Sequence, residues 1–81
     1  MQTTTVPTLA EYPLPDSLDV HRVFPLDLHV FGLSCGGGTY LWEPRKARCR
    51  YLSDLPDPVF MQREGDRHLL INRQGLVIRI P

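Results

Sequence analysis

Several features are scarce in this chain of 81 residues, and each scarcity narrows what the protein can be. No apolar run approaches the roughly 20 residues that a membrane-spanning helix needs, so we expect no membrane partner. No segment repeats apolar residues with a helical period, which argues against amphipathic helices. The formal net charge is zero, so no global field draws the chain to nucleic acid or anionic lipid. Any electrostatic binding must therefore come from a local patch.

Metal-ligating residues are also few and poorly spaced. The only cysteines are Cys35 and Cys49, and His21, His29 and His68 are scattered along the chain. Zinc sites usually present paired cysteines or histidines two to four residues apart. The sequence therefore predicts no metal site and no cofactor.

The first twelve residues carry neither the basic start nor the apolar core of a secretory signal. We therefore expect a cytoplasmic protein with reduced thiols. Cys49 falls on the apolar side of its predicted strand, where a small buried thiol is common. A disulfide between Cys35 and Cys49 stays open if the two face each other across a hairpin.

Proline is abundant, and it is concentrated near the N-terminus. Pro7, Pro13 and Pro15 interrupt residues 1–17, where they block a helix and remove hydrogen-bond donors from any strand. We predict an N-terminal arm over residues 1–17 and one small β domain over residues 18–81. The arm keeps apolar side chains that would let it pack on the body or on another copy, namely Val6, Leu9, Tyr12 and Leu14. Self-association through the arm is therefore one partner prediction.

Turn residues divide the rest of the chain into about six short strands. Strands are predicted over residues 18–24 and 26–33, and Pro25 is expected to end the first or to mark a sheet edge. Two consecutive hairpins over residues 59–80 give the strongest local signal. The predicted fold is all-β: a small up-and-down meander forming a partly open barrel or a compact sandwich.

Residues 39–52, TYLWEPRKARCRYL, form the predicted hairpin that carries the candidate function. Its second strand alternates, with Lys46, Arg48 and Arg50 on one side. Four of the nine basic residues lie between positions 45 and 50, and aromatic residues flank them. The candidate binding residues are Tyr40, Trp42, Arg45, Lys46, Arg48 and Arg50.

Three interpretations of this basic-aromatic hairpin stay open. It could bind an acidic protein surface, since arginine pairs well with carboxylates. It could bind nucleic acid, with cations on successive phosphates and Tyr40 or Trp42 stacking on bases. Finally, the cations could be a solvated strand edge that blocks aggregation, with Trp42 and Tyr51 in the core. An acidic N-terminal third, net −3 over residues 1–27, is a further internal partner for these cations.

An enzymatic alternative centres on Cys35. Ser34 and Cys35 enter a glycine-rich turn whose amides could stabilise an oxyanion, and His29 or His68 could act as the base. The GGGT motif leads into a strand and not a helix, so it does not resemble a phosphate-binding loop. We therefore predict a non-enzymatic protein–protein interaction module, with nucleic-acid binding as the alternative and a small Cys- or Ser-dependent enzyme third.

Overall fold

The structure is a computed structural model that describes residues 11–81. These residues form seven strands and a single-turn 3₁₀ helix: β1 (Val20–Asp27), β2 (Val30–Cys35), β3 (Gly38–Glu43), η1 (Pro44–Lys46), β4 (Arg48–Ser53), β5 (Pro58–Glu64), β6 (Arg67–Asn72) and β7 (Val77–Ile80). No helix within the described range has the length and hydropathy to cross a membrane.

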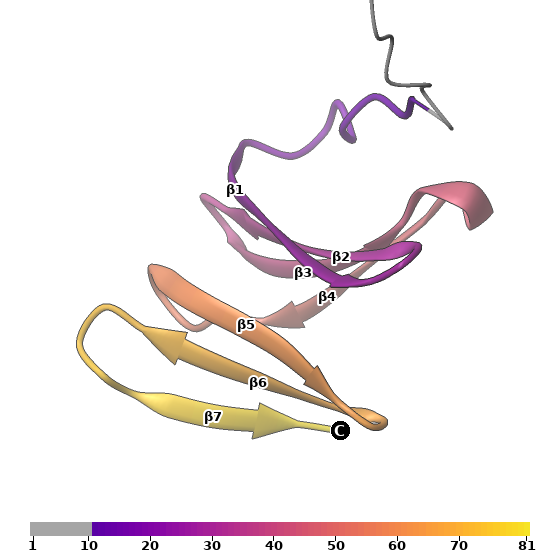
Figure 1. Cartoon of the computed structure of the whole chain (residues 1–81). Coiled ribbons are helices and arrows are strands. Elements are labelled where there is room, and N and C mark those ends of the chain that lie inside the picture. Colours follow the sequence, from indigo (N-terminus) through magenta and orange to yellow (C-terminus); the bar gives the residue numbers. More distant parts are fainter. Residues whose placement is uncertain (1–10) are drawn as a thin grey trace, which may run out of the picture.

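Within each of two sheets, every strand pairs antiparallel with its neighbours in the sequence. The first four make one sheet in the order β1-β2-β3-β4, and the last three make a second in the order β5-β6-β7. The two sheets form two layers (Figure 1). The predicted all-β meander is confirmed, with seven strands in place of about six.

The hydrophobic core lies between the two sheets. Leu41 comes from β3, Leu55 from the connection between the sheets, Met61 from β5 and Leu70 from β6. Partly buried side chains from both layers complete it: Phe24, Leu26, Val30, Leu52, Ile78 and Ile80. A core shared by two facing sheets is the packing of a sandwich.

One glycine sets how closely the sheets approach. Gly32 lies in the middle of β2, opposite Phe24 of β1 and Leu41 of β3. A β-carbon built on it would lie 2.2 Å from the Sδ atom of Met61. A residue with a side chain at this point of contact between the layers would have to displace the end of the Met61 side chain.

The predicted strand over residues 26–33 is wrong. The chain turns at Leu28 and His29, so that β1 ends at Asp27 and β2 begins at Val30. Leu28 is 79% exposed, because it lies in the tight turn rather than on a strand. Pro25 lies inside β1, which is an edge strand, and the edge interpretation of this proline is confirmed.

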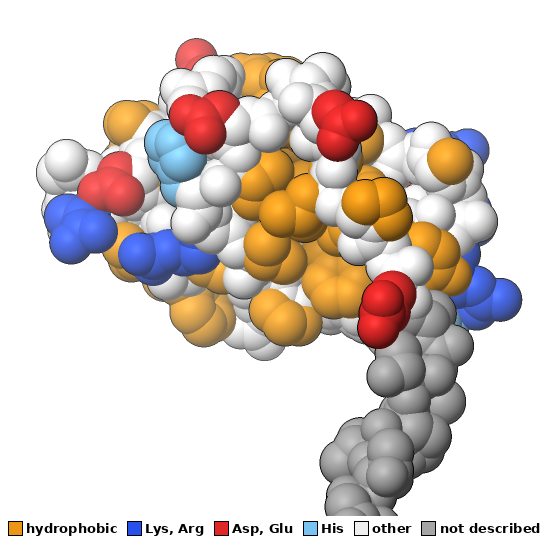
Figure 2. All heavy atoms as spheres, turned by 90° about the horizontal axis from the view of Figure 1, so that it is seen from above, with side chains coloured by type: hydrophobic (Ala, Val, Ile, Leu, Met, Phe, Trp, Pro, Cys, Tyr) orange, Lys and Arg blue, Asp and Glu red, His pale blue; other side chains and the backbone are white. Residues whose placement is uncertain are grey.

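Part of the N-terminal arm covers the outer face of the four-stranded sheet. Residues 1–10 lie outside the described residues, so the predicted arm is seen only from position 11. Residues 11–19 form no strand and run above this sheet (Figure 1). Figure 2 looks down on this side, where hydrophobic side chains gather in the middle and charged ones lie around them.

Candidate functional site

The candidate hairpin consists of β3, η1 and β4. Pro44 starts η1, where a missing N–H costs nothing, and Ala47 ends it in the left-handed conformation with φ 49°. Regular alternation therefore begins only at Arg48. The prediction that Lys46 shares a strand face with Arg48 and Arg50 is wrong, because Lys46 belongs to the helical turn at the hairpin tip.

The two sides of β4 carry different chemistry. Arg50 pairs with Leu41 and Arg48 with Glu43, so both arginines lie on the side that faces the second sheet. Cys49 pairs with Trp42 and Tyr51 with Tyr40, on the outer side. Because successive residues of a strand point to opposite faces, Arg50 lies on the side of the sheet opposite Tyr40 and Tyr51. Arg48, at the start of β4, also borders a hollow that Trp42 lines.

The positive charge of the hairpin is only partly compensated. The Glu43 carboxylate lies 3.4 Å from the Lys46 Nζ atom and 3.9 Å from a terminal nitrogen of Arg48. Within residues 11–81, neither Arg45 nor Arg50 makes an ion pair. The predicted fold-back of acidic residues 11–27 onto these two cations is therefore not seen in the described part of the chain.

Aromatic rings line the outer side of the hairpin. Trp42 is 9% exposed and its ring lies 5.8 Å from that of Phe31 on β2. Tyr40 and Tyr51 meet edge to face at 5.6 Å. Tyr51 is nevertheless 54% exposed, so the alternative that placed it in the core is wrong. Trp42 is buried, but on the outer face and not between the sheets.

The position of Cys49 also differs from expectation. Cys49 is exposed, not buried, because its side of β4 has no second layer over it. Cys35 pairs with Gly38 and Cys49 with Trp42, four residues further along β3. This offset corresponds to roughly 13 Å along the strand, well beyond disulfide range. Both thiols are free.

A shallow apolar hollow of about 320 Å³ lies beside the start of β4. The arm contributes Tyr12, Pro13 and Pro15 to one wall, and Trp42 lies in the other wall. Its remaining lining comes from Pro44, Ala47, Arg48 and Cys49. The hollow therefore joins the outer side of the β4 edge to the arm. This agrees with the alternative in which the arm packs on the body, although the sequence does not indicate that the arm meets Trp42.

His68 lies buried on the side of β6 that faces the first sheet, with 4% of its surface exposed. Neither ring nitrogen has a hydrogen-bond partner within the described residues. Burial, together with the nearby charges of Arg63 and Arg50, lowers the pKa of His68 below its ordinary value. Arg50 therefore acts electrostatically on the interior of the sandwich as well as on its edge.

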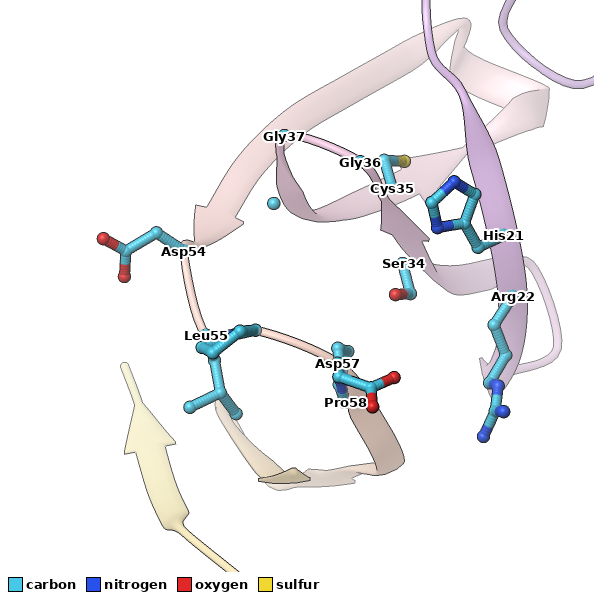
Figure 3. A pocket seen from close by; sticks show the side chains of 12 residues that line it. His21, Arg22, Ser34, Cys35, Gly36, Gly37, Asp54, Leu55, Asp57 and Pro58 are labelled. Carbon is cyan, nitrogen blue, oxygen red and sulfur yellow. The ribbon is translucent and has the colours of Figure 1, made fainter. Parts of the chain in front are cut away.

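A second hollow, of about 430 Å³, lies where β1 and β2 meet the connection between the sheets. Figure 3 shows His21 and Arg22 on β1, Ser34 and Cys35 on β2, and the chain from Asp54 to Pro58 closing it from below. Of the histidines, only His21 lines this hollow with Cys35. His29 lies in the turn at the other end of β2, and His68 is in the second sheet. Neither predicted base is near the thiol.

The surroundings of Cys35 are those of a weak nucleophile. Burial raises the pKa of this thiol, and the negative charges of ionised Cys49 and of Asp19 raise it further. The His21 Nε2 atom lies 3.0 Å from the Asp19 carboxylate, and no hydrogen bond joins His21 to Cys35. Since thiolates and not thiols are the reactive species, this geometry offers little support for thiol catalysis.

In comparisons with protein-family models, with curated proteins and with solved structures, nothing matches this chain significantly.

Proposed function

We propose that this chain is a non-enzymatic protein–protein interaction module that binds an acidic surface of its partner through the β3–η1–β4 hairpin. One observation carries the proposal: Arg45 and Arg50 lie without an ion pair among the described residues, on a hairpin whose last strand is exposed along most of its length. The first four residues of β4 are all exposed.

Carboxylates are the chemistry that suits these cations. The arginine guanidinium pairs with carboxylates in a planar, two-pronged geometry, and such charge-assisted bonds are stronger than neutral ones. Ion pairs at an exposed surface contribute little to the stability of a monomer. Arginines without an ion pair therefore reduce the stability of this fold very little. They form ion pairs when an acidic surface covers them.

The opposite placement of rings and cations favours a protein partner over nucleic acid. Proteins that bind single strands present aromatic stacking rings within a positively charged groove. Here Tyr51 and Tyr40 lie on the outer side of β4, and Arg48 and Arg50 on the inner side. A single-stranded nucleic acid bound on one side of β4 would therefore not contact both the tyrosine rings and the arginines.

Charge reversal tests the proposal. The double variant R48E and R50E should lose binding to the protein that the wild-type chain captures from its native host, by about tenfold or more in Kd. The control is R22E with R67E, which changes the charge equally on other strands and should bind like the wild type. Fluorescence of Trp42, the only tryptophan, reports whether each variant is folded. Equal affinity of both double variants would refute the proposal.

The same preparations test the other functions. Binding to single-stranded DNA or RNA that weakens steeply with salt would favour the nucleic-acid alternative. An activity abolished by alkylation of Cys35 would favour the enzyme. Self-association through the arm remains a prediction, and sedimentation of the full chain against a chain lacking residues 1–17 tests it.

A further inference from the structure

The β4 strand is the open edge of the four-stranded sheet. Its one sheet neighbour is β3, so the opposite edge of β4 presents backbone N–H and C=O groups that no described strand pairs. Edge strands of this kind readily accept another strand. The other edge, β1, is protected: it contains Pro25, its pairing with β2 shifts register twice, and it packs against β5.

The outer side of this edge can accept apolar side chains. The apolar hollow lined by Trp42 and Tyr12 lies directly beside Cys49. Tyr51, further along β4, exposes its ring on the same side. A strand laid against β4 would place every second side chain over this outer surface.

The inner side of the edge would receive acidic side chains. Arg48 and Arg50 project on this side, and Arg50 makes no ion pair with any described residue. In an added strand, apolar side chains would face the outer side. The side chains between them would lie on the inner side, beside Arg48 and Arg50.

The charges of β4 also argue against a second copy of this chain as the strand that pairs with its free edge. Pairing of β4 with its own copy would set the arginines of the two copies on one face of adjacent strands. Like charges placed side by side across strands are destabilising. An acidic segment would replace this repulsion by attraction.

From these observations we infer that β4 takes up an extended segment of the partner protein as a fifth strand. The segment alternates acidic and apolar residues, with the acidic ones beside Arg48 and Arg50 and the apolar ones on the side of Cys49 and Tyr51. This inference rests on the proposed function, since it specifies how the hairpin binds an acidic partner.

Synthetic hexapeptides test the inference with the full-length protein. The probe is a peptide of alternating Glu and Val, and the controls are a peptide with the same composition in two blocks and one of alternating Lys and Val. Wild-type protein should bind the alternating Glu peptide about tenfold or more tightly than either control. The R48E and R50E double variant should prefer the alternating Lys peptide, and the R22E and R67E variant should behave like the wild type.

Amide hydrogen exchange then separates strand addition from simple charge attraction. In an edge strand, every second N–H group points away from the sheet. Within β4 these amides should exchange more slowly once the alternating Glu peptide is bound, and those of β1 should not change.

Two results would overturn strand addition. One is tight binding of both Glu peptides without slower exchange in β4, which leaves the proposed function standing. The other is no binding of the alternating Glu peptide even at low salt. The proposed function is judged separately, by the effect of the double reversal on binding of the native partner.

Discussion

Replacing Gly32 by alanine should disturb the contact between the two sheets. The added β-carbon would lie 2.2 Å from the Met61 Sδ atom and 2.9 Å from its methyl carbon. Ordinary contacts between such atoms are about 3.5–4.0 Å, so the end of the Met61 side chain must move by roughly 1.5 Å. Met61 is almost fully buried among core residues, including Leu41 and Leu70, and the space for that movement is small.

The expected cost combines two opposing effects. Overfilling a packed core costs about 1–3 kcal/mol, and the flexible methionine side chain places this substitution in the lower part of that range. Alanine also restricts the unfolded chain, which returns about 0.4–1 kcal/mol. We therefore expect G32A to lower the free energy of unfolding by about 1 kcal/mol, or roughly 4–8 °C in Tm for a domain of this size.

A double-mutant cycle identifies the cause. M61A alone leaves a cavity and should cost about 2–5 kcal/mol, but in the G32A background the new methyl group partly fills that cavity. The double variant should therefore be more stable than the sum of the single effects predicts, by more than the roughly 0.5 kcal/mol scatter of independent sites. Urea denaturation followed by Trp42 fluorescence measures all four proteins.

The matched control is G37A, because a β-carbon on Gly37 meets no atom within 4 Å. It should stay within about 0.5 kcal/mol of the wild type, as exposed substitutions usually do. Additive effects of G32A and M61A, or a G32A protein as stable as the wild type, would show that Gly32 does not set the spacing of the sheets.

Other measurements test single groups. Because the pKa of His68 is lowered in the folded state by its burial, the unfolded chain binds this proton more readily, and stability should fall as the pH drops below about 6.5, by at most ~1.4 kcal/mol per pH unit. Urea titrations at several pH values check this, and H68L should remove that slope. The hydrogen bond from Arg73 lowers the pKa of Asp57 below 3.8, so its stabilising effect is present above that pH and is lost as the pH falls through the lowered value. D57N should remove this second acid-sensitive step and weaken the native fold at neutral pH. Exposed Cys49 should react with a thiol reagent faster than Cys35, and C49S should abolish the fast phase; equal rates at the two thiols would contradict the placement of Cys49.

The C-terminal half of the fold is predictable because its turns have a local cause. Gly65 and Gly75 adopt positive φ, at 63° and 87°, where glycine pays no steric penalty. The strands they separate carry short apolar runs, and the structure has them over Pro58–Glu64, Arg67–Asn72 and Val77–Ile80. In this region, local sequence patterns are sufficient to predict the strands and turns.

The first half is less predictable because apolar residues do not all face the core. Leu28 strengthens the pattern of a strand over residues 26–33 but lies in an exposed turn. Cys49 and Tyr51 alternate with cations, which suggests burial, but their side of β4 is the outer one. Which face of a sheet meets a second layer depends on contacts far apart in the sequence.

The sequence indicates where the candidate site lies but does not predict how its residues are arranged in space. Residue types alone single out Tyr40, Trp42, Arg48 and Arg50, all of which lie on the hairpin. Their separation onto two sides follows from the register of β3 with β4 across the turn at residues 44–47, which residue types alone do not indicate. The contribution of the arm, such as Tyr12 beside Trp42, depends on a contact between distant segments. Proline near a strand aromatic is too weak a signal to predict it.

The strictly sequential pairing of strands has a kinetic consequence. Each sheet is built from hairpins whose strands are close in the sequence, three of them joined by loops of two residues at positions 28–29, 36–37 and 65–66. Loops this short bring strand ends together at little entropic cost, and local contacts favour rapid folding. We therefore expect the docking of one sheet on the other to be the slow step of folding. The contact between Gly32 and Met61 would form in that step, so substitutions there should change the folding rate more than substitutions in the turns.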